Sequence, residues 1–386
     1  MKNWTHTIFA ILVASPLAAQ STWVVDLMNR PGTDFTHLGV AVSAASPGDT
    51  LLLRYVDAGQ VGAYVLGSTA ITRGLTIVGV GGPAPVNYTL TVEQLPAGEH
   101  VVLRNLQIAP IATGIWQGWG FPMGTGGTSL LIDDCLGSVH LQNIVRDHVP
   151  AGWTTWNVEN CKLVTLTECQ LPHNLIFGYQ FEDVEELVIT RSQFLANAAT
   201  AFSPTMSVAD STITLVDSTV QSSGSQTAIN LCNAELRLGG PETMVGVGSG
   251  SAVYSCGTES RIVLGPGAQL GPTATMTVST PVSALGAYVD NNHVLDVVVV
   301  GPEFGLAVLA IGDLLPSPVP MWGNQLHLGA NTVVFDVVLL DASGRATTQY
   351  ALASSLPPGH SSWLQAVTLD ASLKLRLTPP AIKTTP

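Results

Sequence analysis

The chain has 386 residues, of which 46% are hydrophobic and 11% are charged, so it can bury a large core beneath little charged surface. The formal net charge of −13 argues against a nucleic-acid partner, which needs a basic surface, but is compatible with cations or neutral glycans. Scarce Lys, Glu and Gln beside plentiful Val, Thr, Ser and Gly favour strands and turns over helices.

The N-terminus has the features of a secretory signal peptide over residues 1–19. It carries a single Lys, a short apolar run at 8–14, and small residues around a cleavage point near residues 18–20. That run is too short to span a membrane, and the later apolar stretch 294–312 is interrupted by charges and a proline. We therefore expect a mature protein without a transmembrane segment, secreted or held at the cell surface, where disulfides persist.

A short helix is expected within residues 33–53. Thr36 is placed to cap it, and Leu38, Ala41 and Val42 follow with the spacing of one buried helical face. The segment then breaks at Ser-Pro-Gly-Asp and continues as a strand. Such a helix would cover the open end of a stacked apolar core, as the terminal units of repeat proteins do.

An internal repeat follows, in segments that alternate apolar and polar residues as strands do. The intervals between equivalent positions are 23 to 26 residues, apart from one of 38 that contains an insertion. This period is too short for a propeller blade, and the leucine-rich signature is absent, so we predict a parallel β-helix over residues 23–286. One apolar position recurs at Ile77, Leu103, Leu141, Leu166, Ile189, Leu215, Leu238 and Val263.

The opening of the chain resembles a known family. The segments "WVVDLMNRPGTDFTHLGVAVSAASPGDTLLL" and "GLTIVGVGG" look like the start of secreted right-handed β-helix proteins of the pectin-lyase-like superfamily. The motif-level match covers about residues 23–82 and departs from the family pattern at 54–73, where the usual short turn lies within a longer stretch. The resemblance implies an all-β fold, a right-handed parallel β-helix with an N-terminal capping helix.

The period ends at about residue 287. Short alternating strands follow, separated by Gly-Pro, Pro-Ser-Pro, Asp-Ala-Ser-Gly and Pro-Pro-Gly turns. We expect residues 287–386 to form a small C-terminal β-sandwich. Surface attachment, secretion sorting, a binding function, and a spacer or end cap for the solenoid all fit a domain of this kind.

No sequence motif for a metal or an organic cofactor is present, so we expect neither. The densest polar cluster falls within one coil. Its carboxylates and basic residues could cleave a glycosidic bond or abstract a proton, whereas solvated turn residues are the simpler interpretation. The candidate catalytic residues are Asp133, Asp134, His140, Arg146, Asp147 and His148.

Tryptophans mark two neighbouring loops. Trp116 and Trp119 lie in the insertion, and Trp153 and Trp156 lie in the loop one coil later. Since long loops often form the binding face of a solenoid, and exposed Trp suits sugar stacking, these four are candidate ligand-binding residues. Burial of the same side chains against the solenoid wall is the alternative.

Four of the five cysteines are predicted to form two vertical pairs. Aligned by the repeat, Cys135 lies one coil before Cys161, and Cys232 lies one coil before Cys256, all in the same slot. Neighbouring coils bring Cα atoms to about 5 Å, within the disulfide range. Each pair is therefore either bridged or stacked as thiols, while Cys169 takes a different slot.

These features predict a secreted β-helix protein with a non-catalytic surface or glycan-interacting function and a polysaccharide as its candidate partner. The alternative is a polysaccharide lyase or glycoside hydrolase that acts at the Trp and Asp/His loops. The two differ in geometry, because an enzyme requires the polar cluster to converge with the tryptophans in one groove. The sequence leaves the oligomeric state open.

Overall fold

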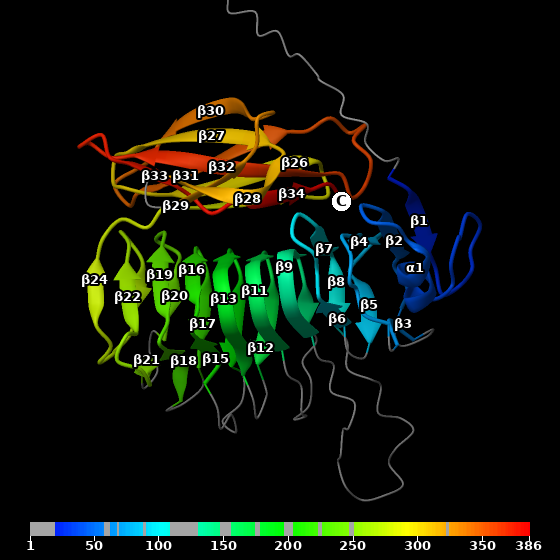
Figure 1. Ribbon diagram of the computed structural model, residues 1–386, viewed down its shortest axis with the longest axis horizontal. Coiled ribbons are helices and arrows are strands. Elements are labelled where there is room, and N and C mark those ends of the chain that lie inside the picture. Colours follow the sequence, from blue (N-terminus) through cyan, green and yellow to red (C-terminus); the bar gives the residue numbers. More distant parts are fainter. Residues whose placement is uncertain are drawn as a thin grey trace, which may run out of the picture.

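The computed structural model describes residues 20–386 except 58–61, 68, 88–89, 109–129, 147–155, 174–177, 197–203, 223–225, 247–250 and 322–323. Within these residues the chain forms a parallel β-solenoid that is covered along one side by antiparallel sheets (Figure 1). The one α-helix of this described part is α1 (Leu38–Ala44). No described helix is long and apolar enough to cross a membrane.

Two parallel sheets form the solenoid, as the repeat predicted. The main path of the first sheet runs through β1 (Thr22–Val25), β2 (Thr50–Arg54), β4 (Thr76–Val80), β7 (His100–Arg104), β9 (Leu130–Gln142), β11 (Trp156–Thr167), β13 (Tyr179–Thr190), β16 (Thr212–Val216), β19 (Glu235–Gly239), β22 (Arg261–Leu264) and β24 (Thr277–Ser279). Four further strands belong to this sheet: β6 (Leu90–Glu93), β15 (Met206–Ala209), β18 (Thr227–Cys232) and β21 (Ser251–Ser255). The second sheet holds β3 (Tyr64–Val65), β5 (Ala84–Asn87), β8 (Leu106–Ile108), β10 (Val145–Arg146), β12 (Gln170–His173), β14 (Gln193–Ala196), β17 (Thr219–Gln221), β20 (Met244–Val245) and β23 (Gln269–Leu270).

The predicted repeat sets the register of the first sheet up to its last coils. Ile77, Leu103, Leu141, Leu166, Ile189, Leu215 and Leu238 stack as direct partners, all buried. The prediction is wrong at the next position, because Leu238 pairs with Leu264 while Val263 pairs with Arg237. This coil spans one residue more than the repeat assumed, so Val263 falls in the neighbouring row.

The coils from β7 to β19 turn from the first sheet to the second through a corner residue in the left-handed region of backbone space. Asn and Gly adopt this conformation readily, whereas longer side chains adopt it at a cost. The corner residues change from amides to charged side chains along the solenoid. In order they are Asn105 (φ 53°), Asn143 (φ 50°), Glu168 (φ 58°), Arg191 (φ 47°), Asp217 (φ 46°) and Gly240 (φ 86°).

The helix α1 lies beside the first coils and joins the solenoid core. Its residues Leu38, Ala41 and Val42 are buried among the core side chains, as their spacing predicted. The predicted cap is wrong by one residue. His37 rather than Thr36 precedes the helix, in an extended conformation and without a side-chain capping hydrogen bond.

The C-terminal strands form antiparallel sheets, named here the C-terminal sheets. One sheet contains β25 (Ala284–Val289), β26 (Val294–Val300) and β31 (Arg345–Ala351), and a hairpin joins β28 (Leu314–Met321) to β29 (Asn324–Leu328). The other sheet contains β27 (Leu306–Gly312), β30 (Val333–Leu339), β32 (Ser361–Leu369), β33 (Leu375–Leu377) and β34 (Ala381–Thr384). Side chains from both sheets, such as Val297 and Leu309, share one apolar core.

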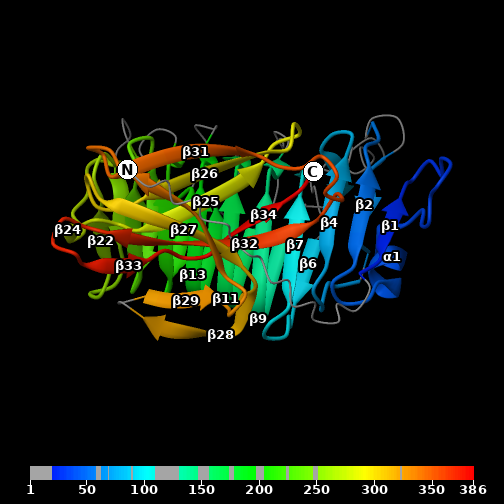
Figure 2. The ribbon, with the colours of Figure 1, turned by 90° about the horizontal axis from the view of Figure 1, so that it is seen from above.

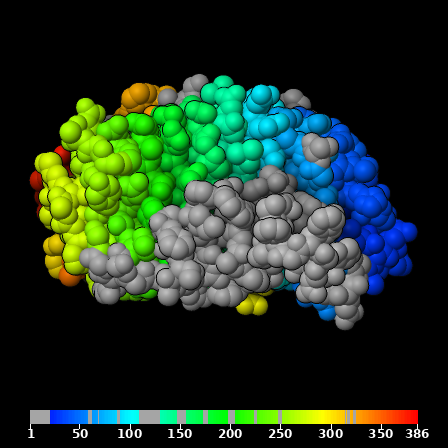
Figure 3. Space-filling model, turned by 90° about the horizontal axis from the view of Figure 1, so that it is seen from below, coloured from blue at the N-terminus to red at the C-terminus, as the bar shows by residue number. Residues whose placement is uncertain are grey.

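The C-terminal sheets lie along the flank of the solenoid (Figures 1 and 2). Seen from the opposite side, the solenoid coils follow one another along the long axis, and the C-terminal residues show only at the margins (Figure 3). Trp363 and Ile382 pack on Val102 of β7, and Val298 packs with Val216 of β16. The end-cap and spacer interpretations of this segment are therefore wrong, because it packs on strands in the middle of the solenoid.

Candidate functional site

The described members of the predicted polar cluster do not converge. Asp133, in the first half of β9, accepts a hydrogen bond from Asn160 Nδ2 at 3.1 Å, and its neighbour Asp134 is exposed. His140 lies in the second half of β9, and Arg146 lies in β10 of the second sheet. The cluster in the sequence is thus divided between different walls of the coil.

His140 is completely buried beneath the C-terminal sheets. Its Nδ1 lies 2.7 Å from Thr165 Oγ1, its Nε2 lies 2.8 Å from Ser138 Oγ, and its ring stands edge-on to Trp363 at 4.7 Å. Burial, followed by the charge of His100, holds the pKa of His140 well below its usual range. A neutral imidazole sealed from solvent cannot reach a polysaccharide, so the catalytic interpretation of His140 is wrong.

Arg146 is also buried, with 3% of its surface exposed. Its Nη1 donates a hydrogen bond to the Tyr179 hydroxyl at 3.3 Å, and its guanidinium carbon lies 6.0 Å from the centre of that ring. Because Tyr179 belongs to the solenoid core, Arg146 points into the solenoid. The catalytic interpretation of Arg146 is therefore wrong.

Trp156 belongs to the solenoid core instead of a binding loop. Its side chain is 1% exposed and stands perpendicular to Tyr179, with 5.5 Å between ring centres. Burial, which the sequence left as the alternative, is the observed outcome, so Trp156 offers no face for a sugar. The remaining predicted site residues, which are Trp116, Trp119, Trp153, Asp147 and His148, lie outside the described residues.

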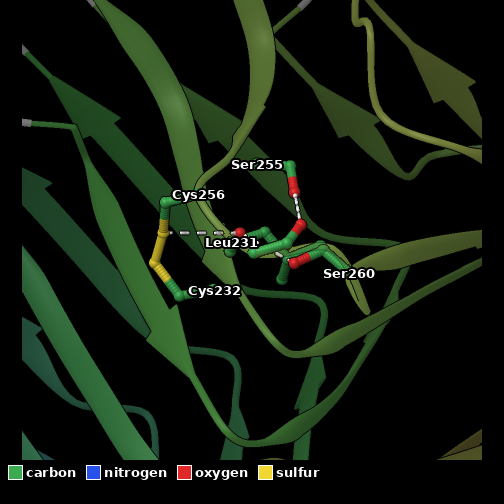
Figure 4. Close-up of a disulfide and its surroundings, with 6 residues drawn as sticks. Leu231, Cys232, Ser255, Cys256 and Ser260 are labelled. Atoms are coloured by element: carbon green, nitrogen blue, oxygen red, sulfur yellow. Dashed lines mark hydrogen bonds between the residues drawn. A yellow bond between two sulfur atoms is a disulfide. The ribbon is translucent and has the colours of Figure 1, made fainter.

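One of the two predicted cysteine pairs is bridged. Cys232 and Cys256 form a disulfide between neighbouring coils, with 4.9 Å between their Cα atoms (Figure 4). Cys135 and Cys161 are register partners in the buried core and remain thiols. The prediction of a single shared slot is wrong: Cys232 aligns with Ala209, on the wall outside the core, so the two pairs occupy different rows.

The disulfide gives a testable thiol count. Unfolded under non-reducing conditions, the protein should show three free thiols, rising to five after reduction. Replacing both Cys232 and Cys256 with Ser should lower the free energy of unfolding by about 3 kcal/mol, since the bridge closes a loop of 24 residues. One free thiol before reduction would mean that Cys135 and Cys161 are bridged as well.

A groove, named here the coil groove, crosses consecutive coils at the corner between the two sheets. Its floor is a mainly polar row on the outer face of the second sheet, in which Gln193 pairs with Thr219, and Thr219 pairs with the apolar Met244. Gln170 and Gln269 extend the same row at its two ends. The groove is lined by Glu168, Arg191, Gln193, Asp217, Thr219, Pro241, Glu242 and Met244.

Arginines hold the carboxylates of the coil groove. Arg191 forms ion pairs with Glu168, at 2.7 Å, and with Asp296 of β26. Arg345, which begins β31, binds Asp217 at 2.7 Å. Burial raises the pKa of Glu168 and of Asp217, and the facing arginines oppose that rise. The rim of the C-terminal sheets thus fixes the charged side chains of the groove in place.

A smaller pocket, the junction pocket, opens where the hairpin β28–β29 meets the solenoid. Glu186 Oε2 of β13 lies 3.7 Å from His327 Nε2 of β29, and Lys162 and His100 line the same pocket. Burial raises the pKa of Glu186 to about 7, and burial together with Lys162 lowers the pKa of His327 to about 4. Within the described part of the chain, no three such groups are arranged to hold a metal ion.

The raised pKa of Glu186 predicts a loss of stability as the pH rises from 4.5 to about 7. A carboxyl whose pKa rises on folding from 4.5 to about 7 stabilises the fold below pH 4.5, and this contribution disappears as the pH rises through 7. Replacing Glu186 with Gln should therefore raise the free energy of unfolding at pH 8 by up to about 3 kcal/mol, with little effect at pH 4.5. Equal effects of the substitution at both pH values would contradict the assignment.

Neither the coil groove nor the junction pocket is visible as a local sequence pattern, for a physical reason. The coil groove is formed by corner residues that are separated by a full repeat, and its signal is the replacement of Asn by Glu168 and Arg191 at one slot. The junction pocket unites Glu186 with His327 from the C-terminal sheets, and no local pattern links them. Aligning polar as well as apolar slots of the repeat would have found the first site.

Comparisons with known proteins give little further information. No protein-family model matches the chain, and no curated protein matches it. Among solved structures, the enzymatically active domain of tailspike protein 2 from bacteriophage CBA120 is similar over 86% of this chain and 72% of its own, with 13% identity and a TM-score of 0.35. Full-length tailspike protein 2 from an Escherichia coli O157:H7 bacteriophage is similar over 89% of this chain and 55% of its own, with 11% identity and a TM-score of 0.31. Neither likeness identifies a family or an activity for this chain.

Proposed function

We propose that the protein binds an extracellular polysaccharide without cleaving it, and that the coil groove is its binding surface. The main support for this proposal is the row of polar side chains on the floor of the groove, where Gln170, Gln193 and Thr219 occupy equivalent positions of successive coils. Parallel strands repeat at about 4.8 Å, which is close to the length of one sugar unit. A glycan chain lying along the solenoid would therefore meet a new hydrogen-bonding group at each of these three coils.

The corner conformation of Glu168 and Arg191 supports the same site. A residue other than Gly or Asn in the left-handed region costs on the order of 1 kcal/mol, and such residues cluster at binding sites. Asn fills this corner without that cost in two earlier coils, at positions 105 and 143. A function for the charged side chains explains why the cheaper residue is absent at the groove.

The ion pairs of the groove favour binding over catalysis. Glycosidases need one carboxylic acid that can donate a proton and one carboxylate free to attack or to activate water. Glu168 and Asp217 are each held by an arginine, so neither is free for these tasks. The alternative of a polysaccharide lyase or glycoside hydrolase also loses His140 and Arg146, which are buried.

We further place the protein outside the cytoplasm, since a disulfide such as Cys232–Cys256 persists in an oxidising compartment. In this proposal the solenoid is a right-handed β-helix of the pectin-lyase-like type, and α1 is its N-terminal cap. The C-terminal sheets are a small β-sandwich that shapes the upper margin of the groove through Asp296 and Arg345.

A panel of neutral and acidic polysaccharides, assayed for binding and for new reducing or unsaturated ends, tests the proposal. Glu168→Asn is the sharpest variant, since Asn fits this corner and should preserve the fold while weakening binding about tenfold. Gln193→Ala should act in the same direction, and Gln180→Ala, on another face of the solenoid, is the matched control. Chain cleavage, or binding unaffected by both groove variants, would overturn the proposal.

A further inference from the structure

The strand β30 forms an open edge of the C-terminal sheets. Among the described strands it pairs only with β27, so the backbone groups on its other side have no strand partner. Figure 1 shows β30 on the side of these sheets that faces away from the solenoid. A free edge of seven residues is a ready template for another strand.

Proteins commonly keep exposed strands apart with Lys, Pro, a bulge or an inward charge. The sequence of β30, VVFDVVL, contains neither Lys nor Pro, and its pairing with β27 shifts register once, between Leu309 and Ala310. Its only charged residue, Asp336, accepts a hydrogen bond from the Tyr350 hydroxyl and another from the Val337 backbone N–H at 2.7 Å. Because Tyr350 belongs to β31 of the other sheet, the carboxylate is engaged between the two sheets and leaves no free charge at the edge.

An apolar surface, named here the edge patch, accompanies the open edge. Leu306 is the register partner of Leu339, and Phe304 donates its backbone N–H to the carbonyl oxygen of Asp341 beside the end of β30, so these apolar residues adjoin the strand. Its exposed side chains are Val333 (52%), Val334 (54%), Val337 (54%), Leu339 (74%), Leu306 (36%) and Phe304 (71%). They leave on the order of 500 Å² of apolar surface, as large as the biggest patch of a typical monomer.

We propose that β30 pairs antiparallel with β30 of a second copy of this chain, giving a two-fold symmetric dimer. Two edge patches would bury about 1,000 Å², which reaches the lower limit for a specific interface. Copies with a net charge of −13 repel one another, and β30 offers an edge without a free charge at which they can meet. The same strand then supplies both partners, as a self-complementary interface requires. The dimer does not depend on glycan binding.

Sedimentation velocity of the full chain over a wide concentration range tests the proposal. The wild type should dimerise reversibly, and Val337→Lys with Leu339→Lys should raise the dissociation constant by at least about tenfold. Leu373→Lys is the matched control, because Leu373 is 76% exposed in the loop between β32 and β33 and should leave the dimer intact. Circular dichroism checks that each variant is folded.

Two further measurements keep the result decisive if the lysine variants unfold. The outward amides of β30 should exchange hydrogen more slowly at high protein concentration. Val337→Cys should form a reducible crosslinked dimer, while Leu373→Cys should not. A wild type that stays monomeric throughout, open-ended polymers, or a dimer insensitive to the lysine variants would overturn the proposal.

Discussion

Replacing Trp363 with Ala is expected to lower the free energy of unfolding by about 3–5 kcal/mol and to loosen the C-terminal sheets from the solenoid. The indole ring is 7% exposed and packs with Val102. It also stands edge-on to His100 at 4.8 Å and to His140 at 4.7 Å. Its removal leaves a cavity between the C-terminal sheets and the solenoid and exposes the rings of His100 and His140 to water. The protein therefore loses both the packing of the indole and the exclusion of water from the two histidines.

Urea unfolding and limited proteolysis measure this effect. The Trp363 variant should unfold at lower urea concentration, and proteases should cut within the C-terminal sheets under conditions that spare the wild type. Tyr254→Ala is the control, because Tyr254 is 59% exposed on the solenoid and its loss should cost less than about 0.5 kcal/mol. A loss below about 1 kcal/mol for the Trp363 variant would contradict the role of Trp363 as the anchor.

Acidification from pH 6.5 to pH 4 is expected to detach the C-terminal sheets. Burial lowers the pKa of His100 to about 4 and of His327 to about 4, and it also holds the pKa of His140 well below its usual range. A depressed pKa means stability that is present above the unfolded value of 6.5 and lost as the pH falls through the folded value. A pKa of about 4 instead of 6.5 corresponds to about 3 kcal/mol for each of these two histidines, so together they supply much of the stability of a typical domain.

The acid response can be separated from general acid unfolding. His327→Gln should flatten the loss of stability between pH 6.5 and 4, whereas His37→Gln, at the exposed start of α1, should follow the wild type. Glu186 acts in the opposite sense, since its contribution grows as the pH falls from 7 to 4.5. The net dependence should therefore steepen in Glu186→Gln. Identical pH profiles for the wild type and His327→Gln would contradict the prediction.

The solenoid could be predicted because its cause is periodic. Every coil stacks an apolar side chain on the equivalent side chain of the preceding coil. The contact between Leu141 and Leu166 can therefore be recognised in the sequence as a regular interval between apolar residues. The error at Val263 shows the limit of this argument, since one added residue per coil moves a strand by one row. The helix was found from its apolar face, but its cap was missed because no side chain forms that cap.

The candidate sites could be predicted only in part because burial depends on what covers a surface. His140 and Ser138 lie on the outward row of β9, which on a bare solenoid would face solvent. The C-terminal sheets cover this row and bury it, and no sequence pattern near residue 140 indicates that burial. The cluster of polar residues around His140 in the sequence therefore suggested a functional site, whereas His140 lies in a contact between the solenoid and the C-terminal sheets.

The contact between Gln142 and strand β34 has a consequence for synthesis of the chain. Gln142 Nε2 donates a hydrogen bond to the carbonyl oxygen of Ile382, 240 residues later, at 2.8 Å. Stacked coils form from neighbours in sequence, whereas this contact closes a very long loop and so forms late. During translation the flank of the finished coils, including Val102, stays bare until β34 leaves the ribosome. The exposed flank makes the nascent protein prone to aggregation until β34 is released. A chaperone that covers the flank would reduce this aggregation, and slow release of the chain at high temperature would increase it.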